Sequence, residues 1–178
     1  MQNRQPNRLR GYNYSQNGFY FVTICTQNHA EWFGRIRNGE MELNRYGETA
    51  RNKWLEIPQH FENIRLDEFV IMPNHIHGII VIENVAVNVG SRHACSLQKH
   101  ACPRTYQTIP IVIGSYKSAA TREINMLIMQ NKNNFHWQKS FYDHIIRNES
   151  SLNQIREYIN GNPRRWDMDI ENMVIPGI

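Results

Sequence analysis

The sequence predicts one α+β domain, residues 1–178, in which a small antiparallel sheet carries helices packed mainly on one of its faces. Short runs rich in β-branched and aromatic residues alternate with longer segments of helical periodicity, in the order strand, helix, strand, strand, helix, strand, helix. The composition, with 40% hydrophobic and 20% charged residues in 178 positions, is that of an ordinary globular protein. This length is enough for one domain with its own hydrophobic core.

The first half of the chain is expected to hold three strands, a hairpin turn and one helix. Asn38-Gly39 is a typical two-residue hairpin turn. Asn44 is a suitable N-cap for a helix that runs to about Ile57 and that Pro58 closes. The expected strands, all rich in β-branched and aromatic residues, are 19–26, 66–72 and 75–82, the last two separated by a break at Pro73-Asn74.

The second half is expected to hold two helices with short extended segments between them. These elements are a helix over 109–129, extended segments at 135–138 and 141–146, and a last helix from Ser150 or Ser151 to Asn160 or Gly161. Gln154 stands three residues after Ser151, as in a capping box, and Pro163 stops the helix.

Two stretches show no clear period. Residues 1–18 are expected to form a flexible basic arm, and residues 83–108 a loop excursion of small, polar and basic residues. Loops of that length are usually functional or mobile. The excursion repeats the sequence His-Ala-Cys at 93–95 and 100–102, and these four side chains could bind zinc, although their spacing matches no site that we can assign.

The sequence also bears on the cellular compartment. Three cysteines do not make a disulfide framework, which agrees with a reducing environment. No apolar run is long enough to cross a bilayer, and the N-terminus lacks the apolar segment of a signal peptide. We therefore expect a cytoplasmic protein without a membrane partner.

The basic residues are unevenly distributed along the chain. The net charge is +4, and Arg4, Arg8 and Arg10 precede any acidic residue. Between Glu83 and Glu123 there are five lysines and arginines and no acid. Such a segment suits contacts with nucleic-acid phosphates, and the alternative is a solvated basic loop.

The pair His75 and His77 is the first candidate for chemistry. It stands at the head of the apolar run 79–82, which is expected to be a strand. Alternate residues of a strand share one face, so both imidazoles would point the same way and could begin a divalent-metal site. The alternative is a pair of structural histidines that bond to the backbone.

Tyr158 and Asn162 are the second candidate, because residues four apart share one face of a helix. If this helix packs near His75 and His77, the Asn162 amide oxygen can act as a third metal ligand. Two nitrogens and a neutral oxygen leave positions for phosphate oxygens on Mg²⁺ or Mn²⁺, and the phenol of Tyr158 is a credible nucleophile. The alternative reading is a core tyrosine followed by an asparagine that caps the helix.

These residues carry a family resemblance. The sequence Met-Pro-Asn-His-Ile-His-Gly at 72–78 resembles the His-hydrophobe-His (HUH) motif of the single-tyrosine, IS200-like transposases. Three further segments resemble the branch of REP-associated tyrosine transposases. They are 137–148 (its Trp-Gln…Phe-Tyr/Trp-x-His-x-Ile-Arg-Asn block), 158–163 (its Tyr-Ile-x-x-Asn-Pro motif) and 114–118 (its Phe-Lys-Ser helix).

The resemblance implies a ferredoxin-like or RRM-like fold with the HUH motif on a central strand. It implies a metal-dependent endonuclease and strand transferase that acts on single-stranded DNA at hairpin-forming, palindromic repeats near the nucleoid. Tyr158 would form a 5′-phosphotyrosine intermediate, and His75, His77 and Asn162 would hold the metal. Asn162 stands where the insertion-sequence relatives have glutamine. The resemblance leaves open whether the protein acts as a monomer or as a homodimer.

Several basic and aromatic side chains are candidates for contacts with single-stranded DNA. The basic candidates are Arg8, Arg10, Lys117, Arg122, Arg147, Arg164 and Arg165. The aromatic ones, which could stack on bases, are Trp137, Phe141, Tyr142 and Trp166, with core packing favoured for Phe141.

Two other functions are compatible with parts of this pattern. One is a module that binds hairpin DNA or RNA without cutting it, for which the combination of His75, His77 and Tyr158 is not needed. The other is a zinc hydrolase that uses the two histidines and the His/Cys repeat. Such enzymes need a carboxylate base, and no acidic residue neighbours the histidine pair in the sequence.

Overall fold

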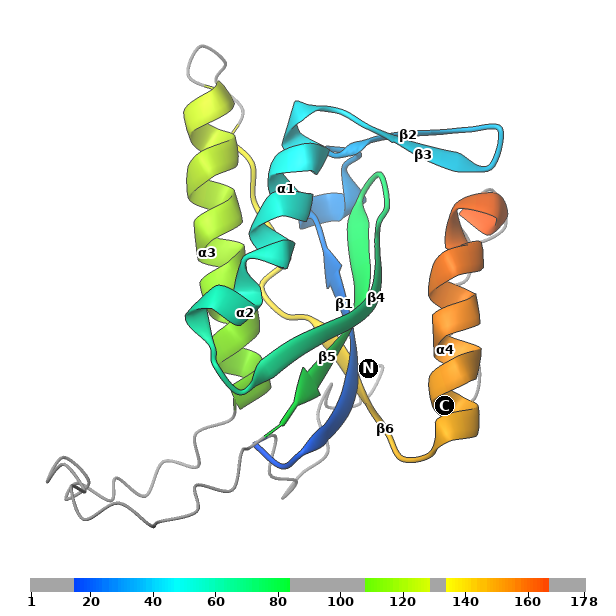
Figure 1. The fold of residues 1–178 in the computed structure, drawn as a ribbon. Coiled ribbons are helices and arrows are strands. Elements are labelled where there is room, and N and C mark those ends of the chain that lie inside the picture. The colour runs from blue at the N-terminus through cyan, green and yellow to red at the C-terminus, as the bar shows by residue number, and fades with distance from the viewer. Residues whose placement is uncertain (1–14, 84–107, 129–133, 167–178) are drawn as a thin grey trace, which may run out of the picture.

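The computed structural model describes residues 15–83, 108–128 and 134–166 of the chain (Figure 1). The arm up to residue 14 and residues 84–107, which include both His-Ala-Cys repeats, lie outside the described residues.

A four-stranded antiparallel sheet forms the centre of the molecule, in the order β4-β5-β1-β6 (Figure 1). Its strands are β1 (Gly18–Cys25), β4 (Ile64–Ile71), β5 (His75–Ile82) and β6 (Tyr142–Ile146). Strand β5 pairs on both sides, and all eight of its residues are buried. The HUH motif therefore lies on a central strand, with the bounds that its sequence predicts.

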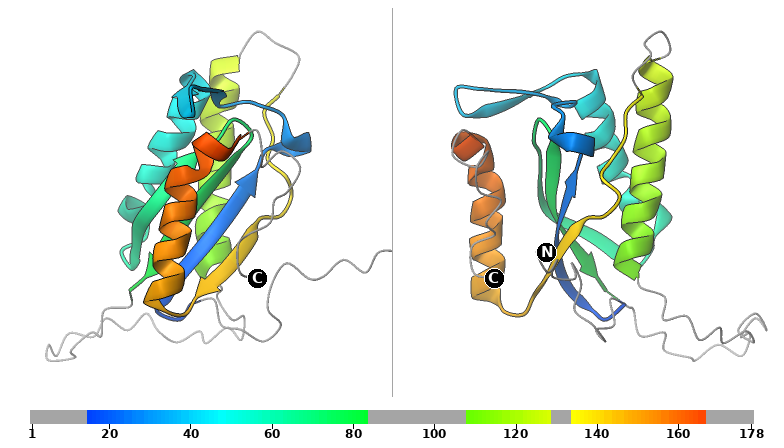
Figure 2. Two further views of the ribbon diagram at one scale, coloured as in Figure 1. Left: turned by 90° about the vertical axis from the view of Figure 1, so that its right-hand side faces the viewer. Right: turned by 180° about the vertical axis from the view of Figure 1, so that it is seen from behind.

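The helices cover the two faces of this sheet unequally (Figure 2). One face carries α1 (Arg45–Leu55), α2 (Ile57–His60) and α3 (Thr108–Ile128), and the other carries α4 (Glu149–Gly161), which continues into the 3₁₀ turn η2 (Asn162–Arg165). The predicted α+β class, with helices mainly on one face, is confirmed.

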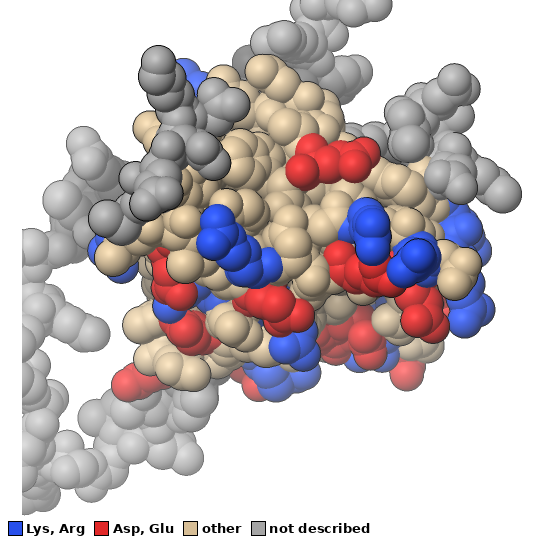
Figure 3. Space-filling view, turned by 90° about the horizontal axis from the view of Figure 1, so that it is seen from above, with Lys and Arg blue, Asp and Glu red and all other residues tan. Residues whose placement is uncertain are grey.

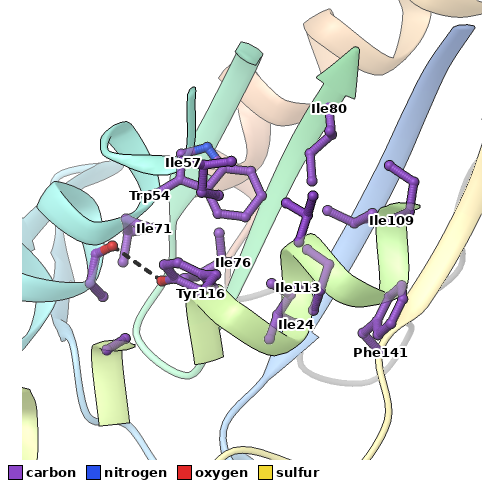
Figure 4. Packing of buried hydrophobic residues seen from close by; sticks show 14 of the residues in the cluster. Ile24, Trp54, Ile57, Ile71, Ile76, Ile80, Ile109, Ile113, Tyr116 and Phe141 are labelled. Carbon is purple, nitrogen blue, oxygen red and sulfur yellow. Dashed lines mark hydrogen bonds between the residues drawn. The ribbon is translucent and has the colours of Figure 1, made fainter. Parts of the chain in front are cut away.

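The side-chain alternation of β5 divides the core between the two faces. Ile76 and Ile80 belong to the larger cluster beneath α1 and α3 (Figure 4), whereas Ile79 and Val81 pack with α4. In the larger cluster, the Tyr116 hydroxyl donates to the Ala50 carbonyl at 3.1 Å, so its buried polar atom is satisfied.

Gly78 of the motif faces the larger cluster at a point of close approach. A Cβ atom at this position would lie 2.4 Å from Cζ2 of Trp54, which is completely buried. The glycine therefore lets the α1 indole lie directly against the central strand.

A separate hairpin extends over the C-terminal end of α4 (Figure 1). It consists of β2 (Gly34–Arg37) and β3 (Glu40–Leu43), joined by Asn38 and Gly39 at φ values of 53° and 75°. Two left-handed residues fit the predicted hairpin turn. The hairpin contacts η2, because a Cβ atom at Gly39 would lie 3.1 Å from Cγ of Arg164.

Asn44 caps α1 as predicted, with its side chain accepting from the backbone N–H groups of Tyr46 and Gly47. Two helix boundaries differ from the prediction at prolines. Pro58 lies in the first turn of α2 rather than closing the preceding helix, and Pro163 lies in the first turn of η2. Proline is tolerated there, because the first backbone N–H groups of a helix have no intrahelical acceptor.

The start of α4 also differs from the prediction. Asn148, not Ser150 or Ser151, caps the helix, since its side-chain oxygen accepts from the Ser151 N–H at 2.8 Å. Asparagine and serine are both good N-cap residues, so the sequence alone does not show which of them caps the helix.

Candidate metal and tyrosine site

His75 and His77 face α4 from the head of β5. Only 5% and 4% of their surfaces are exposed, and their Nε2 atoms lie 3.0 Å apart. The strand thus presents two imidazole nitrogens to one point, on the side of the sheet that α4 covers.

The Nδ1 atom of each histidine forms a hydrogen bond with another side chain. Nδ1 of His75 lies 2.7 Å from Oδ1 of Asn74, and Nδ1 of His77 lies 2.8 Å from Oγ1 of Thr23. Thr23 is directly opposite His77 in the β1–β5 ladder. Partners of this kind orient metal-binding histidines, because they fix which ring nitrogen turns inward.

Burial favours the neutral form of both rings. It lowers the pKa of His75 to about 4, with a smaller contribution from the charge of His29. It also lowers the pKa of His77 well below its ordinary value, again with a smaller contribution from His75. Neutral imidazole is the form that binds metal ions, so both rings are available as ligands near pH 7.

Tyr158 of α4 reaches the imidazole pair. Its hydroxyl oxygen lies 3.4 Å from Nε2 of His77, and the two rings meet at an angle of 62°. Phe21 of β1 stacks on His77 and meets the Tyr158 ring edge-on. The structure therefore brings a half-buried phenol, from 81 residues along the chain, to the two histidines.

Asn162 lies on the helix face that carries the phenol, one turn further on. Tyr158 contacts His77, and Trp166, eight residues later, stacks on His75 at 6.0 Å between ring centroids. Asn162 stands midway between Tyr158 and Trp166 in the sequence and is completely buried. Within the described residues, its side-chain nitrogen and oxygen have no hydrogen-bond partner. An unsatisfied buried amide is costly, and a metal ligand would be satisfied when the ion binds.

This donor set fits a hard divalent cation. Two ligands at right angles, each about 2.1 Å from an octahedral ion, lie about 3.0 Å apart, which is the separation of the two Nε2 atoms. Among the described residues, no group of three His, Cys, Asp or Glu side chains could hold an ion. The third protein ligand in this part of the chain would thus be of another type, such as the Asn162 amide.

Asp67 and Arg156 attach the tyrosine helix to the sheet. Nε of Arg156 donates to Oδ1 of Asp67 at 2.8 Å, and Nη2 donates to Oδ2 at 2.6 Å. Strand β4 shifts register between Leu66 and Phe69, and Asp67 stands within this irregularity. Neither the register shift nor this pair was predicted, because the sequence has no signal for either.

The basic candidates are dispersed over the fold. Arg164 and Arg165 are exposed on η2, close to the site, whereas Arg147 lies at the other end of α4. Lys117 and Arg122 are on α3, behind the sheet. Arg8 and Arg10 lie outside the described residues.

Lys117 has a structural role in this fold. Its ammonium donates to the backbone carbonyls of Gln138 at 3.0 Å and Ser140 at 2.7 Å, and it lies over the Phe141 ring. Phe141 and Trp137 pack in or against the core, and Tyr142 is 44% exposed on β6.

The hairpin end of the molecule does not carry charge of one sign. Lysines and arginines lie beside acidic residues on the face seen from above (Figure 3). On the hairpin itself, Arg35 and Arg37 both pair with Glu42, at 2.9 and 3.7 Å. Phosphate binding at this end would therefore rely on particular arginines rather than on a uniform basic surface.

Comparison with known proteins places this geometry in context. No protein-family model matches the sequence. The chain is 41% identical over 168 residues to an uncharacterised protein of Haemophilus influenzae, covering 93% of this chain and 91% of that protein. The chain therefore belongs to the same family as the Haemophilus protein.

A solved structure of a REP-associated tyrosine transposase bound to a REP hairpin has a similar fold. The TM-score is 0.56 at 17% identity, over 95% of this chain and 88% of that chain. The predicted resemblance to these transposases is confirmed at the level of the fold. Within the described residues, none of the helices has the length and apolar character needed to span a membrane.

Proposed function

We propose that the protein is a REP-associated-type tyrosine transposase, a metal-dependent enzyme that nicks and rejoins single-stranded DNA with Tyr158 as its nucleophile. The observation that carries the proposal is the approach of the Tyr158 hydroxyl to within 3.4 Å of Nε2 of His77, beside the second imidazole.

In the proposed reaction, the Tyr158 oxygen attacks a backbone phosphorus and the bond from phosphorus to the 3′ oxygen breaks. The products are a 5′-phosphotyrosine and a free 3′-hydroxyl. The phenol, whose ordinary pKa is about 10, gives up a proton, and the departing 3′ oxygen takes one up. Attack by a 3′-hydroxyl on the phosphotyrosine reverses these steps and joins two strands. The phosphoester bond is conserved throughout, so no nucleotide energy source is needed.

His75, His77 and Asn162 would hold Mg²⁺ or Mn²⁺, which supplies Lewis-acid polarisation of a phosphate oxygen. The chain's own residues set the geometry: β5 fixes the imidazoles, and α4 fixes the phenol. Phe21 and Trp166 cover the imidazole rings and limit the access of water to them.

The proposed substrate is a hairpin-forming repeat with a flanking single strand. This is supported by the fold shared with a transposase that binds a REP hairpin, and by the exposed Arg164 and Arg165 beside the tyrosine helix. Such a substrate implies a cytoplasmic location at the nucleoid. Because one chain supplies the phenol and both imidazoles, we propose that a monomer is competent.

The test is the formation of a covalent adduct that resists denaturant. The protein is incubated with Mg²⁺ and a single-stranded DNA that contains a hairpin and flanking bases. We expect an adduct with the native protein, and none with Tyr158→Phe or without a divalent cation. Tyr142→Phe is the matched control, because that tyrosine is 44% exposed and lies on β6. Binding without any adduct would instead identify a hairpin-binding module.

A further inference from the structure

Asn74 is the polar residue of the HUH motif to which the proposed chemistry gives no task. It lies in the turn between β4 and β5, next to His75. Its backbone carbonyl accepts from the N–H of Thr26 at 2.9 Å, and the Thr26 hydroxyl lies between this carbonyl, at 2.9 Å, and that of Ala30, at 2.7 Å. The turn is thus fixed to the end of β1 before the side chain is considered.

The side-chain amide of Asn74 has only one possible orientation. Its Nδ2 lies 3.2 Å from the backbone carbonyl of His29, which can only accept a hydrogen bond. Nδ2 must therefore face that carbonyl, and Oδ1 must face His75. The carbonyl is held by the turn η1 (Gln27–His29), in which Asn28 and His29 have left-handed φ values of 57° and 52°. Non-glycine residues adopt that conformation infrequently, and more often at functional sites.

The orientation of the amide determines the tautomer of His75. Oδ1 of Asn74 can only accept, so Nδ1 of His75, 2.7 Å away, carries the ring proton and donates it. Nε2 of His75 then has a lone pair directed at Nε2 of His77, 3.0 Å away. The backbone carbonyl of His29 thus determines, through two hydrogen bonds, which nitrogen of the His75 ring carries the proton.

Thr23 does not fix the tautomer of His77. A hydroxyl can either donate or accept, so Oγ1 of Thr23 can pair with Nδ1 of His77 in both tautomers. In the metal-free protein, the lone pair on His75 requires a hydrogen on Nε2 of His77, and Nδ1 of His77 then accepts from Thr23. With a cation bound, Nε2 of His77 must be bare, and Nδ1 can donate to Thr23.

We propose that Asn74 and Thr23 are positioning residues with different tasks: Asn74 locks His75 in its metal-binding tautomer, and Thr23 allows His77 to change tautomer when a divalent cation binds. One proton leaves Nε2 of His77 and one is taken up at its Nδ1, so the ring stays neutral. The part assigned to Thr23 rests on the proposed metal site, whereas the lock by Asn74 does not. Outer partners of metal ligands typically contribute about 10–100-fold to metal affinity.

Nitrogen-15 NMR of the histidine rings in the full chain tests both parts. In the metal-free protein we expect hydrogen on Nδ1 of His75 and on Nε2 of His77. Saturating Mg²⁺, which is diamagnetic, should move the His77 hydrogen to Nδ1 and leave His75 unchanged. Hydrogen on Nε2 of metal-free His75 overturns the lock. The expected metal-free tautomers without any cation binding leave the lock standing, but overturn the part of Thr23 together with the metal-dependent function.

Substitutions separate positioning from general structural support. Asn74→Ala should give a mixture of His75 tautomers and Mn²⁺ binding that is about 10–100-fold weaker. Asn74→Asp keeps an acceptor and should retain hydrogen on Nδ1. A single, unchanged His75 tautomer in Asn74→Ala overturns the proposal. Should that variant fail to fold, the tautomers of the native protein and of Asn74→Asp decide.

Thr23 has a matched pair of variants. Thr23→Val keeps the shape of the side chain without the hydroxyl, and should weaken Mn²⁺ binding about tenfold or more, because Nδ1–H of His77 would be left buried without an acceptor. Thr23→Ser restores the hydroxyl and should restore the affinity. Native affinity in Thr23→Val overturns the role assigned to this residue.

Discussion

Asp67 and Arg156 join strand β4 to helix α4 through two parallel hydrogen bonds, although they lie 89 residues apart in the sequence. The arginine precedes the proposed nucleophile, Tyr158, by two residues. The side chain of Asp67 is 8% exposed and that of Arg156 is 36% exposed, so the pair is partly shielded from water. The position of the tyrosine relative to the imidazoles therefore depends on a carboxylate in an irregular part of an edge strand.

Replacing Asp67 with Asn should loosen α4 and slow adduct formation. We expect a loss of about 10–100-fold in the rate, because small misplacements of a reacting group have effects of this size. Arg156→Lys should also be impaired, since an ammonium cannot reproduce the two-pronged contact. The control is Arg65→Ala, also on β4, which removes the exposed ion pair between Arg65 and Glu83. An equal loss in the control would contradict a specific role for Asp67.

The same pair predicts a pH dependence of stability. The hydrogen bond from Arg156 lowers the pKa of Asp67 below its ordinary value of 3.8. A group whose pKa is lower in the folded state contributes its stabilisation above its unfolded pKa and loses it as the pH falls through the folded value. The native protein should therefore exceed Asp67→Asn in free energy of unfolding at pH 7, and the difference should shrink below about pH 4. Urea unfolding across this range measures it.

Gly78→Ala should destabilise the fold by about 1–3 kcal/mol, because its Cβ would overlap the Trp54 indole. Gly114→Ala is the matched control, since a Cβ atom there meets nothing within 4 Å. On an exposed helical position, that change should stabilise the protein by about 0.5–1 kcal/mol. Urea unfolding of both variants is the measurement. A stable Gly78→Ala protein would show that the indole can shift without cost.

Mixing two inactive variants tests whether one chain suffices. Because Tyr158 lies beside His77 of its own chain, a mixture of Tyr158→Phe and His77→Ala proteins should form no adduct. A dimer that exchanges its tyrosine helices would regain activity in such a mixture. Adduct formation by the mixture, measured on a denaturing gel, would thus contradict the monomeric proposal.

The predicted basic contacts should separate into two groups. Arg164→Ala and Arg165→Ala should each weaken DNA binding and reduce the salt dependence of log affinity by about one unit of slope. Lys117→Met should instead lower the free energy of unfolding and leave DNA affinity unchanged, because its ammonium binds the carbonyls of Gln138 and Ser140. Binding measured at several salt concentrations, together with urea unfolding, distinguishes these outcomes.

Local sequence signals predicted local structure well. The break at Pro73-Asn74 and the apolar run 79–82 predicted strand β5 with its observed bounds, and Asn44 and Asn38-Gly39 predicted a cap and a turn. Each of these signals depends only on residues within one element. The fold class followed from their order and is confirmed.

Features that depend on tertiary pairing were not predicted. Thr23 meets His77 only through the register of β1 against β5, and Asn74 meets His29 only through the turn η1. The contacts of Lys117 with the carbonyls of Gln138 and Ser140 were likewise not predicted, because they join segments more than 20 residues apart. Side-chain placement of this kind depends on contacts between distant segments, which one sequence does not specify.

Among the described helices, α4 alone covers its face of the sheet, and this has a consequence for how the site is assembled. Withdrawing the helix would expose Phe21, Ile79 and Val81 to water, at about 1.5–3 kcal/mol for each large side chain. The phenol is thus kept docked on the imidazoles by the same apolar contacts that seal this side of the protein. In the proposed reaction, the phenol would therefore already lie beside the imidazoles when DNA binds, and we expect no closing motion of the helix to be required before the strand is cut.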